Sequence, residues 1–424
     1  MPLFSADSRY LDVTTEYEHI FDKGLAQRHC SERNRAVCTG CGGHDVMLFH
    51  EQIGVPALVG VQWTTADDAR ECVRGDILLG FCVRCGLVNN VAYDPERVNY
   101  AGNYDNALDE SRVYRQYARA EAERLVEKGC VRESTVLEIG CGRGDFLQTL
   151  CALGNNRGVG LDPSRTPRPE SIAEDERLTF VPDVYSQQHA DLDAKLICCR
   201  QVLEHIAQPT RFLTSLREAI GDCRDVTLYI EVPNLDDVVR RGDIWTVIYE
   251  HCSYFSRSAL KHLLARCGFE VTHMEETFGG TFLAVDAAPV EHVHESMEDA
   301  DHTSILDAQS ILRIVDWCTR KVHYWRSEVR SLAAEGQRIA LWGAGARAVT
   351  FLNLLDINYE IPWVVDINPR KKGHYLPGTA QQVVEPEFLK EYDPNVIIIM
   401  NPVYDDETRS IVNDLGLDPK YLYV

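Results

Sequence analysis

The stretch "TVLEIGCGRGDFLQTL" places the tightest constraint on how this chain folds. A short β run, Thr135–Ile139, leads into glycines at alternate positions, Gly140, Gly142 and Gly144, and a helical pattern follows them. Glycines between a first strand and a helix let the backbone turn sharply and approach a bound nucleotide closely. A second strand follows, and Asp162 stands at its end. The sequence therefore predicts an α/β domain with a nucleotide-type cofactor at the glycine turn.

Two cofactor designs use such a turn, and the acidic residues favour one of them. In dinucleotide-binding domains the helix N-terminus receives a pyrophosphate, whereas in S-adenosylmethionine (SAM) methyltransferases the turn lies against the methionine and ribose. Glu138 stands beside the turn, where a carboxylate repels a pyrophosphate but attracts the ammonium and sulfonium groups of SAM. Asp162 is then expected to bind the ribose hydroxyls, and Asp183, after a third strand, the adenine amino group. The predicted SAM-binding residues are Glu138, Gly140, Gly142, Gly144, Asp162, Asp183 and Gln201.

The next segments complete a methyltransferase-like sheet. A fourth strand, "AKLICCR", leads into a loop with Gln201, Glu204 and His205, at the position that borders the transferable methyl group in methyltransferases. His205 is either a functional residue or simply a polar residue at the start of a helix. "VTLYIEVPNL" predicts a fifth strand, and "RCGFEVTHMEETFGGTFLAVDA" predicts an antiparallel hairpin at the sheet edge.

The stretch "YEHCSYFS" resembles the wall of a pocket, because it sets Glu250 and His251 among aromatic residues. In the methyltransferase fold, the segment after the fifth strand carries substrate-binding residues. We predict that His251 is a general base, because imidazole titrates near neutral pH. Glu250 either orients His251, hydrogen-bonds the substrate or only anchors the loop. His205 and Tyr249 are the other catalytic candidates.

Four of the 15 cysteines form two C-x-x-C knuckles, each followed by glycine. Paired knuckles offer four thiolates to one tetrahedral zinc ion, and the glycines permit the tight turns. A redox-active pair or free thiols are the alternative, although neither pair opens a helix after a strand. "GVPALVGVQWTT", between the knuckles, is interpreted as a strand, and Cys30, Cys72, His44 and His50 are nearby side chains that a four-cysteine site does not need. The predicted zinc ligands are Cys38, Cys41, Cys82 and Cys85.

A second α/β unit follows residues 291–335, which are first charged and then helical. "RIALWGAGARAVTFLNLL" predicts a strand, a glycine turn and a helix; a further strand ends at Asp366, and "PNVIIIMNPVY" contains a third. We interpret this unit as a scaffold for the substrate site without a second cofactor. As an alternative, Lys371 and Lys372 hold a phosphate group of the substrate.

The net charge and the hydropathy of the chain limit the classes of partner that it can bind. The net charge of −22 and the pI near 5.0 repel polyanions, which excludes a broad nucleic-acid surface. The longest aliphatic runs, such as "VIIIM", are too short to cross a bilayer, and the first thirty residues lack a signal-peptide pattern. We therefore expect a cytoplasmic protein that acts on a small molecule, with neither nucleic acid nor membrane as partner. The oligomeric state is not predicted.

The order of these motifs resembles a known family. The cysteine knuckles, the glycine turn with "EHCSYFS", and "LWGAGARAVTFLN" with "VVDINPRKKGHYLPGT" are similar to the three-domain, zinc-containing, SAM-dependent C-methyltransferases of nucleotide-linked 4-keto-deoxysugars. The resemblance implies an α/β protein with a small N-terminal zinc-knuckle domain (1–105), a central class I SAM-methyltransferase Rossmann-like domain (106–290), and a helical linker with a smaller C-terminal Rossmann-like domain (291–424). Where the best-known members carry a tyrosine two places before the Glu–His pair, this chain has Ile248.

The predicted function is SAM-dependent methylation of a carbon next to a ketone, in a nucleotide-linked sugar or another intermediate of natural-product biosynthesis. A base removes a proton from that carbon, and the resulting enolate accepts the methyl group. One alternative is methylation of an oxygen or nitrogen atom of a small molecule. Another is an NAD(P)-dependent oxidoreductase, or a non-catalytic binding scaffold, that uses the C-terminal α/β unit.

Overall fold

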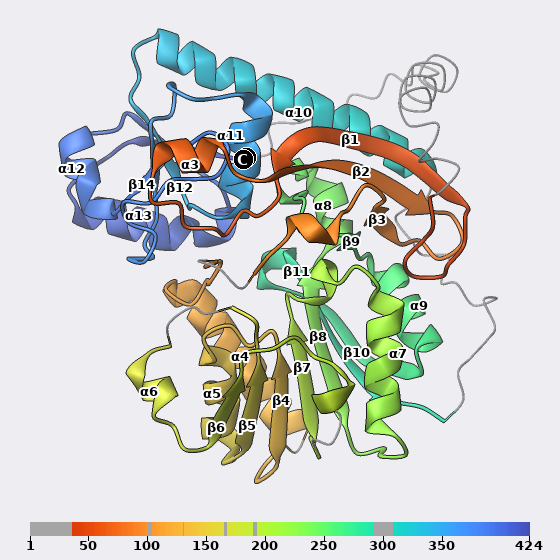
Figure 1. Cartoon of the computed structure of the whole chain (residues 1–424). Helices are drawn as coiled ribbons and strands as arrows, with labels where there is room; N and C mark the ends of the chain where they lie inside the picture. The colour runs from red at the N-terminus through yellow and green to blue at the C-terminus, as the bar shows by residue number, and fades with distance from the viewer. Residues whose placement is uncertain (1–35, 101–103, 130, 165–167, 190–192, 292–307) are drawn as a thin grey trace.

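The computed structural model describes residues 36–100, 104–129, 131–164, 168–189, 193–291 and 308–424. These residues form three sheets (Figure 1). The seven-stranded sheet makes the lower half of the molecule in this view, and the upper half holds the four-stranded and five-stranded sheets.

The seven-stranded sheet contains the five parallel strands and the antiparallel hairpin that the sequence predicts, in the order β10-β11-β8-β7-β4-β5-β6. Its central strands are buried almost throughout, as expected for parallel strands covered by helices on both faces. This arrangement confirms the predicted α/β class. The strands are β4 (Thr135–Ile139), β5 (Arg157–Leu161), β6 (Leu178–Val181), β7 (Leu196–Arg200), β8 (Thr227–Pro233), β10 (Phe269–Thr277) and β11 (Phe282–Pro289).

The helices around this sheet begin at residues suited to helix starts. Pro209 is the first residue of α7, where its missing N–H costs nothing. Ser256 precedes α9, and its hydroxyl accepts a hydrogen bond from the Ala259 N–H. Gly144 precedes α5 with φ of 94°, which favours glycine. The helices are α4 (Arg112–Lys128), α5 (Asp145–Gly154), α6 (Glu170–Ala173), α7 (Pro209–Ile220), α8 (Leu235–Arg241) and α9 (Arg257–Arg266).

The N-terminal sheet takes its last strand from the middle of the chain. Its antiparallel order is β1 (Val46–Pro56), β2 (Arg74–Cys82), β3 (Val88–Asn90) and β9 (Ser253–Tyr254). Strand β9 belongs to the "YEHCSYFS" stretch. The strand predicted in "GVPALVGVQWTT" is wrong beyond Pro56, because the chain there forms a loop that leads to the short helix α3 (Ala66–Arg70).

The C-terminal sheet has five parallel strands in the order β14-β13-β12-β15-β16. The three strands predicted from the sequence correspond to β12, β13 and β15, whereas β14 and β16 include polar residues and lack an apolar run. The strands are β12 (Ile339–Trp342), β13 (Trp363–Val365), β14 (Gln382–Val384), β15 (Val396–Ile399) and β16 (Lys420–Tyr423). The helices are α10 (Ala308–Ala334), α11 (Ala346–Leu355), α12 (Leu389–Tyr392) and α13 (Asp405–Asp414).

A hydrophobic core joins the N-terminal and C-terminal sheets. It runs from the strands β1 and β2 through the segment that precedes β9 to α10 and α11. Trp245 lies at its centre, with its ring 5.0 Å from Phe351, which also lies 5.7 Å from Trp325 of α10. Strand β9 and this shared core both cross the predicted domain limits. That the three predicted domains fold independently therefore stays a prediction.

None of the helices in the described ranges is long and apolar enough to span a membrane.

Candidate active site

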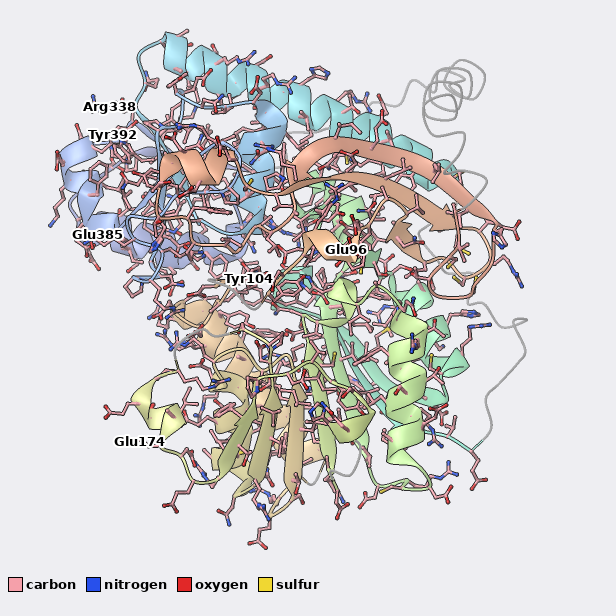
Figure 2. All side chains as sticks on the ribbon, viewed as in Figure 1. Glu96, Tyr104, Glu174, Arg338, Glu385 and Tyr392 are labelled. Atoms are coloured by element: carbon pink, nitrogen blue, oxygen red, sulfur yellow. The ribbon has the colours of Figure 1, made fainter. Side chains whose placement is uncertain are left out.

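A cavity of about 2620 Å³ lies between the two halves of the molecule. Its wall runs from the first cysteine knuckle, Cys38–Gly42, across the glycine turn to the C-terminal sheet. Tyr104, which lies in this wall, is labelled in Figure 2 near the boundary between the two halves. Gly144, Tyr249 and Glu250 are outside the wall. The predicted cofactor and catalytic residues that do line the cavity are Glu138, Gly140, Gly142, Asp162, Asp183, Gln201, His205 and His251.

The glycine turn has the geometry that only glycine adopts readily. Gly140 has φ of 72°, and a Cβ atom there would lie 2.1 Å from Cγ2 of Val202. Gly142, with φ of 52°, donates its N–H to Oδ2 of Asp162 at 2.8 Å. Gly144 precedes α5 and faces Phe180 instead of the cavity. The turn therefore leaves bare backbone at Gly140 and Gly142 against the space where a cofactor would lie.

Asp162 is fixed at the end of β5 by two backbone groups. Its second oxygen, Oδ1, accepts from the N–H of Ser164 at 2.8 Å. Each carboxylate oxygen keeps a further lone pair, so both can still accept a hydroxyl. Asp183, two residues after β6, accepts from Gln188 at 2.8 Å and lines the same cavity. These positions are compatible with the predicted roles at the ribose and the adenine.

Glu138 is a buried carboxylate that lacks a partner for one oxygen among the described residues. Its side chain is 3% exposed, its Oε2 accepts no hydrogen bond, and burial raises its pKa to about 8. At pH 7 burial therefore keeps Glu138 mostly protonated, and a ligand that brings a positive charge would lower this pKa and favour the carboxylate. The ammonium group of SAM is such a charge. The chemistry of this pocket therefore fits SAM.

Gln201 is bound into a polar network behind the cofactor turn. Its backbone has φ of 54°, and its Nε2 donates to Oε1 of Glu231 at 2.9 Å. Glu231 is fully buried and also accepts from Arg200 and from the hydroxyl of Tyr117. This network, which sequence patterns did not reveal, holds the ends of β7 and β8 together beside the cavity.

His251 and His205 lie edge to face in the cavity wall, with ring centroids 4.8 Å apart. Nδ1 of His251 is buried without a hydrogen-bond partner in the described chain, and burial lowers the pKa of this imidazole well below its usual value. Nδ1 of His205 lies 2.8 Å from the Tyr100 hydroxyl and 3.0 Å from the Glu250 carbonyl oxygen. Burial lowers the pKa of His205 to about 4. Both rings are therefore neutral at pH 7.

Glu204 adds an acidic group to the two imidazoles. One carboxylate oxygen of Glu204 and one nitrogen from each of His205 and His251 lie within 4.8 Å of one another. Glu204 is 2% exposed, its Oε2 has no partner in the described residues, and burial raises its pKa to about 8. At neutral pH it is largely a protonated acid that can donate a hydrogen bond.

Glu250 anchors the loop and does not pair with His251. Its Oε1 accepts from the backbone N–H of Val59 at 2.8 Å, and its Oε2 accepts from the Tyr104 hydroxyl at 2.7 Å. Of the roles considered from the sequence, this geometry fits only the anchoring one. Because those partners come from the loop after β1 and the segment before α4, nothing local in the sequence revealed them.

Tyr249 points away from the cavity, against the prediction that it is a catalytic candidate. It is fully buried, and its hydroxyl accepts from the backbone N–H of Asp94 at 2.8 Å. Residues 249 and 250 form a turn, in which the His251 N–H donates to the Ile248 carbonyl oxygen, so Tyr249 and His251 do not share one side as they would on a strand. Tyr100 and Tyr104, noted in the sequence only as preceding a helix, are among the tyrosines that line the cavity.

The two lysines proposed to hold a phosphate are already engaged. Nζ of Lys371 donates to the Ala344 carbonyl oxygen at 3.0 Å and lies 3.3 Å from Asp366. Lys372 pairs with Glu385 at 2.5 Å and lies outside the cavity wall. This geometry does not support the phosphate role for either lysine.

The four knuckle cysteines converge on one point. Sγ of Cys38 lies 3.4 Å from that of Cys85, Sγ of Cys41 lies 3.5 Å from that of Cys82, and all four lie within 4.8 Å. A tetrahedral zinc with bonds of about 2.3 Å separates its sulfur ligands by about 3.8 Å, so this cluster fits the ion. Gly42 and Gly86 have φ of 71° and 73°, as the knuckle turns require. Cys30 lies outside the described residues.

Two family models match consecutive parts of the chain: a methyltransferase domain over residues 110–274 and a C-methyltransferase C-terminal domain over residues 286–415. Among curated proteins, the C-methyltransferase NovU of Streptomyces niveus is 25% identical over 381 residues, which cover 86% of this chain and 89% of that protein.

Solved methyltransferase structures show weaker likeness. The dimethyltransferase RosA from Streptomyces davawensis has a TM-score of 0.34 and 21% identity over 42% of this chain and 55% of that one. Magnesium protoporphyrin IX methyltransferase from Synechocystis PCC 6803, with bound S-adenosylhomocysteine, has a TM-score of 0.33 and 18% identity over 45% of this chain and 91% of that one.

The matched domains and the sheet order together show a SAM-dependent methyltransferase with the domain content of a C-methyltransferase.

Replacing Asp162 by alanine is expected to weaken S-adenosylhomocysteine binding by roughly 10- to 150-fold, because each lost charge-assisted hydrogen bond is worth about 1.5–3 kcal/mol. Titration calorimetry measures this effect. Asp225→Ala removes a surface carboxylate paired with Lys195, away from the cavity, and is the matched control. Unchanged affinity in Asp162→Ala would place the cofactor elsewhere.

Proposed function

We propose that this SAM-dependent methyltransferase methylates a carbon atom next to a carbonyl group of a small molecule, with His251 as the base. The observation that carries the proposal is that His251, whose Nδ1 is buried without a hydrogen-bond partner in the described chain, lines the cavity that also contains the glycine turn. A neutral imidazole nitrogen without a partner is ready to accept a proton, and its low proton affinity is balanced by the negative charge that the substrate acquires.

The proposed reaction has two steps, removal of a proton from the acceptor carbon and transfer of the methyl group to it. The imidazole of His251 takes the proton from the carbon, and the electron pair of that C–H bond forms an enolate. The enolate carbon then forms a bond to the methyl carbon, whose bond to sulfur breaks. SAM, held at the glycine turn and Asp162, would supply the electrophilic methyl group, and neutral S-adenosylhomocysteine would be the leaving product. The proton on His251 passes to solvent afterwards.

Two hydrogen-bond donors in the cavity wall suit the enolate oxygen. Glu204, which is largely protonated at neutral pH, shares a cluster with His251, and the Tyr100 hydroxyl lies against His205. Burial raises the pKa of Tyr100 well above its usual value, so its hydroxyl keeps its proton. Fixed donors in a site without water stabilise developing negative charge more than water does.

We propose that the methyl acceptor carries an anionic group, which binds at the N-terminus of α11. Gly345 precedes this helix without a side-chain cap and lines the cavity. Asn368 lines the cavity there as well, is 2% exposed, and its Nδ2 has no partner in the described chain. Free helix N–H groups and an unpaired amide favour a phosphate or carboxylate. A nucleotide-linked sugar has this chemistry, and NovU is a relative named as a C-methyltransferase.

The proposal is tested by locating the methyl group in the product. The protein is incubated with SAM labelled with ¹³C in the methyl group and a panel of nucleotide-linked keto-sugars, and the product is examined by two-dimensional NMR. A carbon–carbon correlation to the labelled methyl is expected. A correlation across oxygen or nitrogen would overturn the carbon-acid proposal in favour of the O- or N-methylating alternative.

A further inference from the structure

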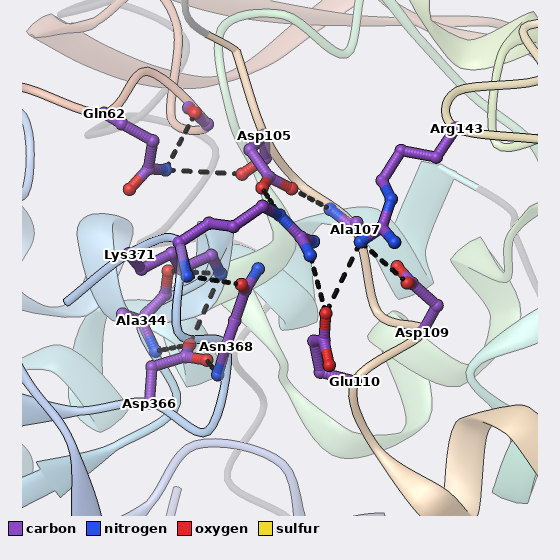
Figure 3. Close-up of polar contacts among 12 residues, drawn as sticks. Gln62, Asp105, Ala107, Asp109, Glu110, Arg143, Ala344, Asp366, Asn368 and Lys371 are labelled. Carbon is purple, nitrogen blue, oxygen red and sulfur yellow. Dashed lines mark hydrogen bonds and ion pairs between the residues drawn. The ribbon is translucent and has the colours of Figure 1, made fainter. Parts of the chain in front are cut away.

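A chain of ion pairs connects the cofactor turn to the C-terminal domain (Figure 3). It starts at Arg143, which stands in the glycine turn between Gly142 and Gly144. The Arg143 side chain is 11% exposed, and its Nη1 lies 3.2 Å from Asp109 and 3.4 Å from Glu110. Arg143 is therefore held by the segment that precedes α4.

Glu110 is shared between two arginines. The oxygen that faces Arg143, Oε1, also accepts from Nη1 of Arg370 at 2.6 Å. Nε of Arg370 donates to Oδ2 of Asp105 at 2.5 Å. The Arg370 guanidinium, from the C-terminal domain, thus binds both ends of residues 105–110, a segment that we call the strap.

Arg370 is itself fixed by the C-terminal glycine turn. Its backbone N–H donates to Oδ1 of Asn368 at 3.0 Å. The next residue, Lys371, binds the carbonyl oxygen of Ala344, and Asp366 accepts from the N–H of Ala344 at 2.8 Å. The chain of contacts therefore runs from one glycine turn to the other.

We infer that Arg370 is a positioning residue for the cofactor turn, through Glu110 and Arg143. Without its charge, Asp105, Asp109 and Glu110 form an acidic strap, and within the described ranges Arg143 is its remaining ion-pair partner. Partly buried charges interact strongly, so the strap and Arg143 would rearrange. Because Arg143 belongs to the turn that contacts the cofactor, the C-terminal domain sets the affinity of the middle domain for SAM.

The full-length Arg370→Ala variant tests this inference by its affinity for S-adenosylhomocysteine, measured by titration calorimetry. A distant residue on a coupling network typically shifts binding by roughly 3- to 30-fold, and weakening in that range is expected. Arg370→Lys should recover part of the affinity, because an ammonium can bind one of the two carboxylates but not both. Since no acceptor is present, the result does not depend on the proposed carbon methylation.

The matched control is Lys372→Ala, which removes the neighbouring cation from an exposed pair with Glu385 outside the cavity. Its affinity should equal that of the wild type. A double-mutant cycle separates positioning from general loss of structure: Arg370→Ala should add little to Glu110→Gln, since both break the same link.

Affinity of Arg370→Ala within twofold of the wild type, or strictly additive effects in the cycle, would overturn the inference. If Arg370→Ala does not fold, the test uses the affinity of Glu110→Gln for S-adenosylhomocysteine, measured in the same way. An affinity within twofold of the wild type would then overturn the inference.

Discussion

Replacing His251 by asparagine is expected to lower turnover by roughly 10²–10⁴-fold, the usual contribution of a positioned general base. Asparagine keeps much of the side-chain size but does not accept a proton near neutral pH. Affinity for S-adenosylhomocysteine should stay unchanged, because the glycine turn and Asp162 are formed by other segments. Steady-state kinetics and titration calorimetry measure the two quantities.

Proton exchange tests the same residue without methyl transfer. With S-adenosylhomocysteine bound, the wild type should exchange the acidic proton of a keto substrate with deuterated solvent, and His251→Asn should not. His273→Asn is the matched control, because His273 pairs with Glu275 on β10 and lies outside the cavity. Undiminished exchange in His251→Asn would transfer the role of base to His205, whose Nδ1 contacts Tyr100.

The expected pH dependence of kcat/KM follows from the burial of His251. The pKa of His251 lies well below its usual value, so the base stays unprotonated as the pH falls through 6.5. The acidic limb of the kcat/KM profile from this group is therefore expected below pH 6.5. A limb above that value would indicate a different titrating base.

Glu250→Gln is expected to reduce turnover less than His251→Asn does. Glutamine retains an acceptor for the Val59 N–H, although its amide cannot reproduce both of the carboxylate contacts. The smaller effect reflects the place of Glu250 behind the wall of the cavity. A loss equal to that of His251→Asn would show that the anchor is as important as the base.

The sequence was sufficient wherever the signal was local. Gly140, Gly142 and Asp162 follow strands in the order that a cofactor turn requires, and the structure brings them together at the carboxyl ends of β4 and β5. The cysteine knuckles were equally clear, since each pair and its glycine lie within five residues. Parallel strands buried on both faces also leave recognisable apolar runs.

The sequence was insufficient where contacts join distant segments. Tyr104 and Val59 come from segments distant in the sequence, so the sequence left three roles open for Glu250, and the structure fits the loop anchor among them. Strand β9 is two residues long and has no periodicity to detect. Its pairing with β3 decides which side chains of the "YEHCSYFS" stretch face the cavity.

The zinc site is expected to have the largest effect on stability. The purified protein should contain about one zinc per chain, and Cys82→Ser should abolish zinc binding and strongly destabilise the N-terminal sheet, since structural zinc supplies about 10–16 kcal/mol in small domains. Metal analysis and thermal unfolding measure both outcomes. Cys72→Ser, at a buried cysteine outside the cluster, should keep the zinc.

Loss of zinc should also impair catalysis more than cofactor binding. Cys82 ends β2, and the second knuckle leads directly into β3, where Val88 pairs with Tyr254 of β9. On the other side, Thr210 of α7 donates to the carbonyl oxygen of Gly40 at 2.7 Å. The knuckles thus support the loop that carries His251, whereas the glycine turn rests on its own sheet. A well-folded, zinc-free protein with normal turnover would contradict this; a zinc-free protein that binds S-adenosylhomocysteine but turns over slowly is the expected result.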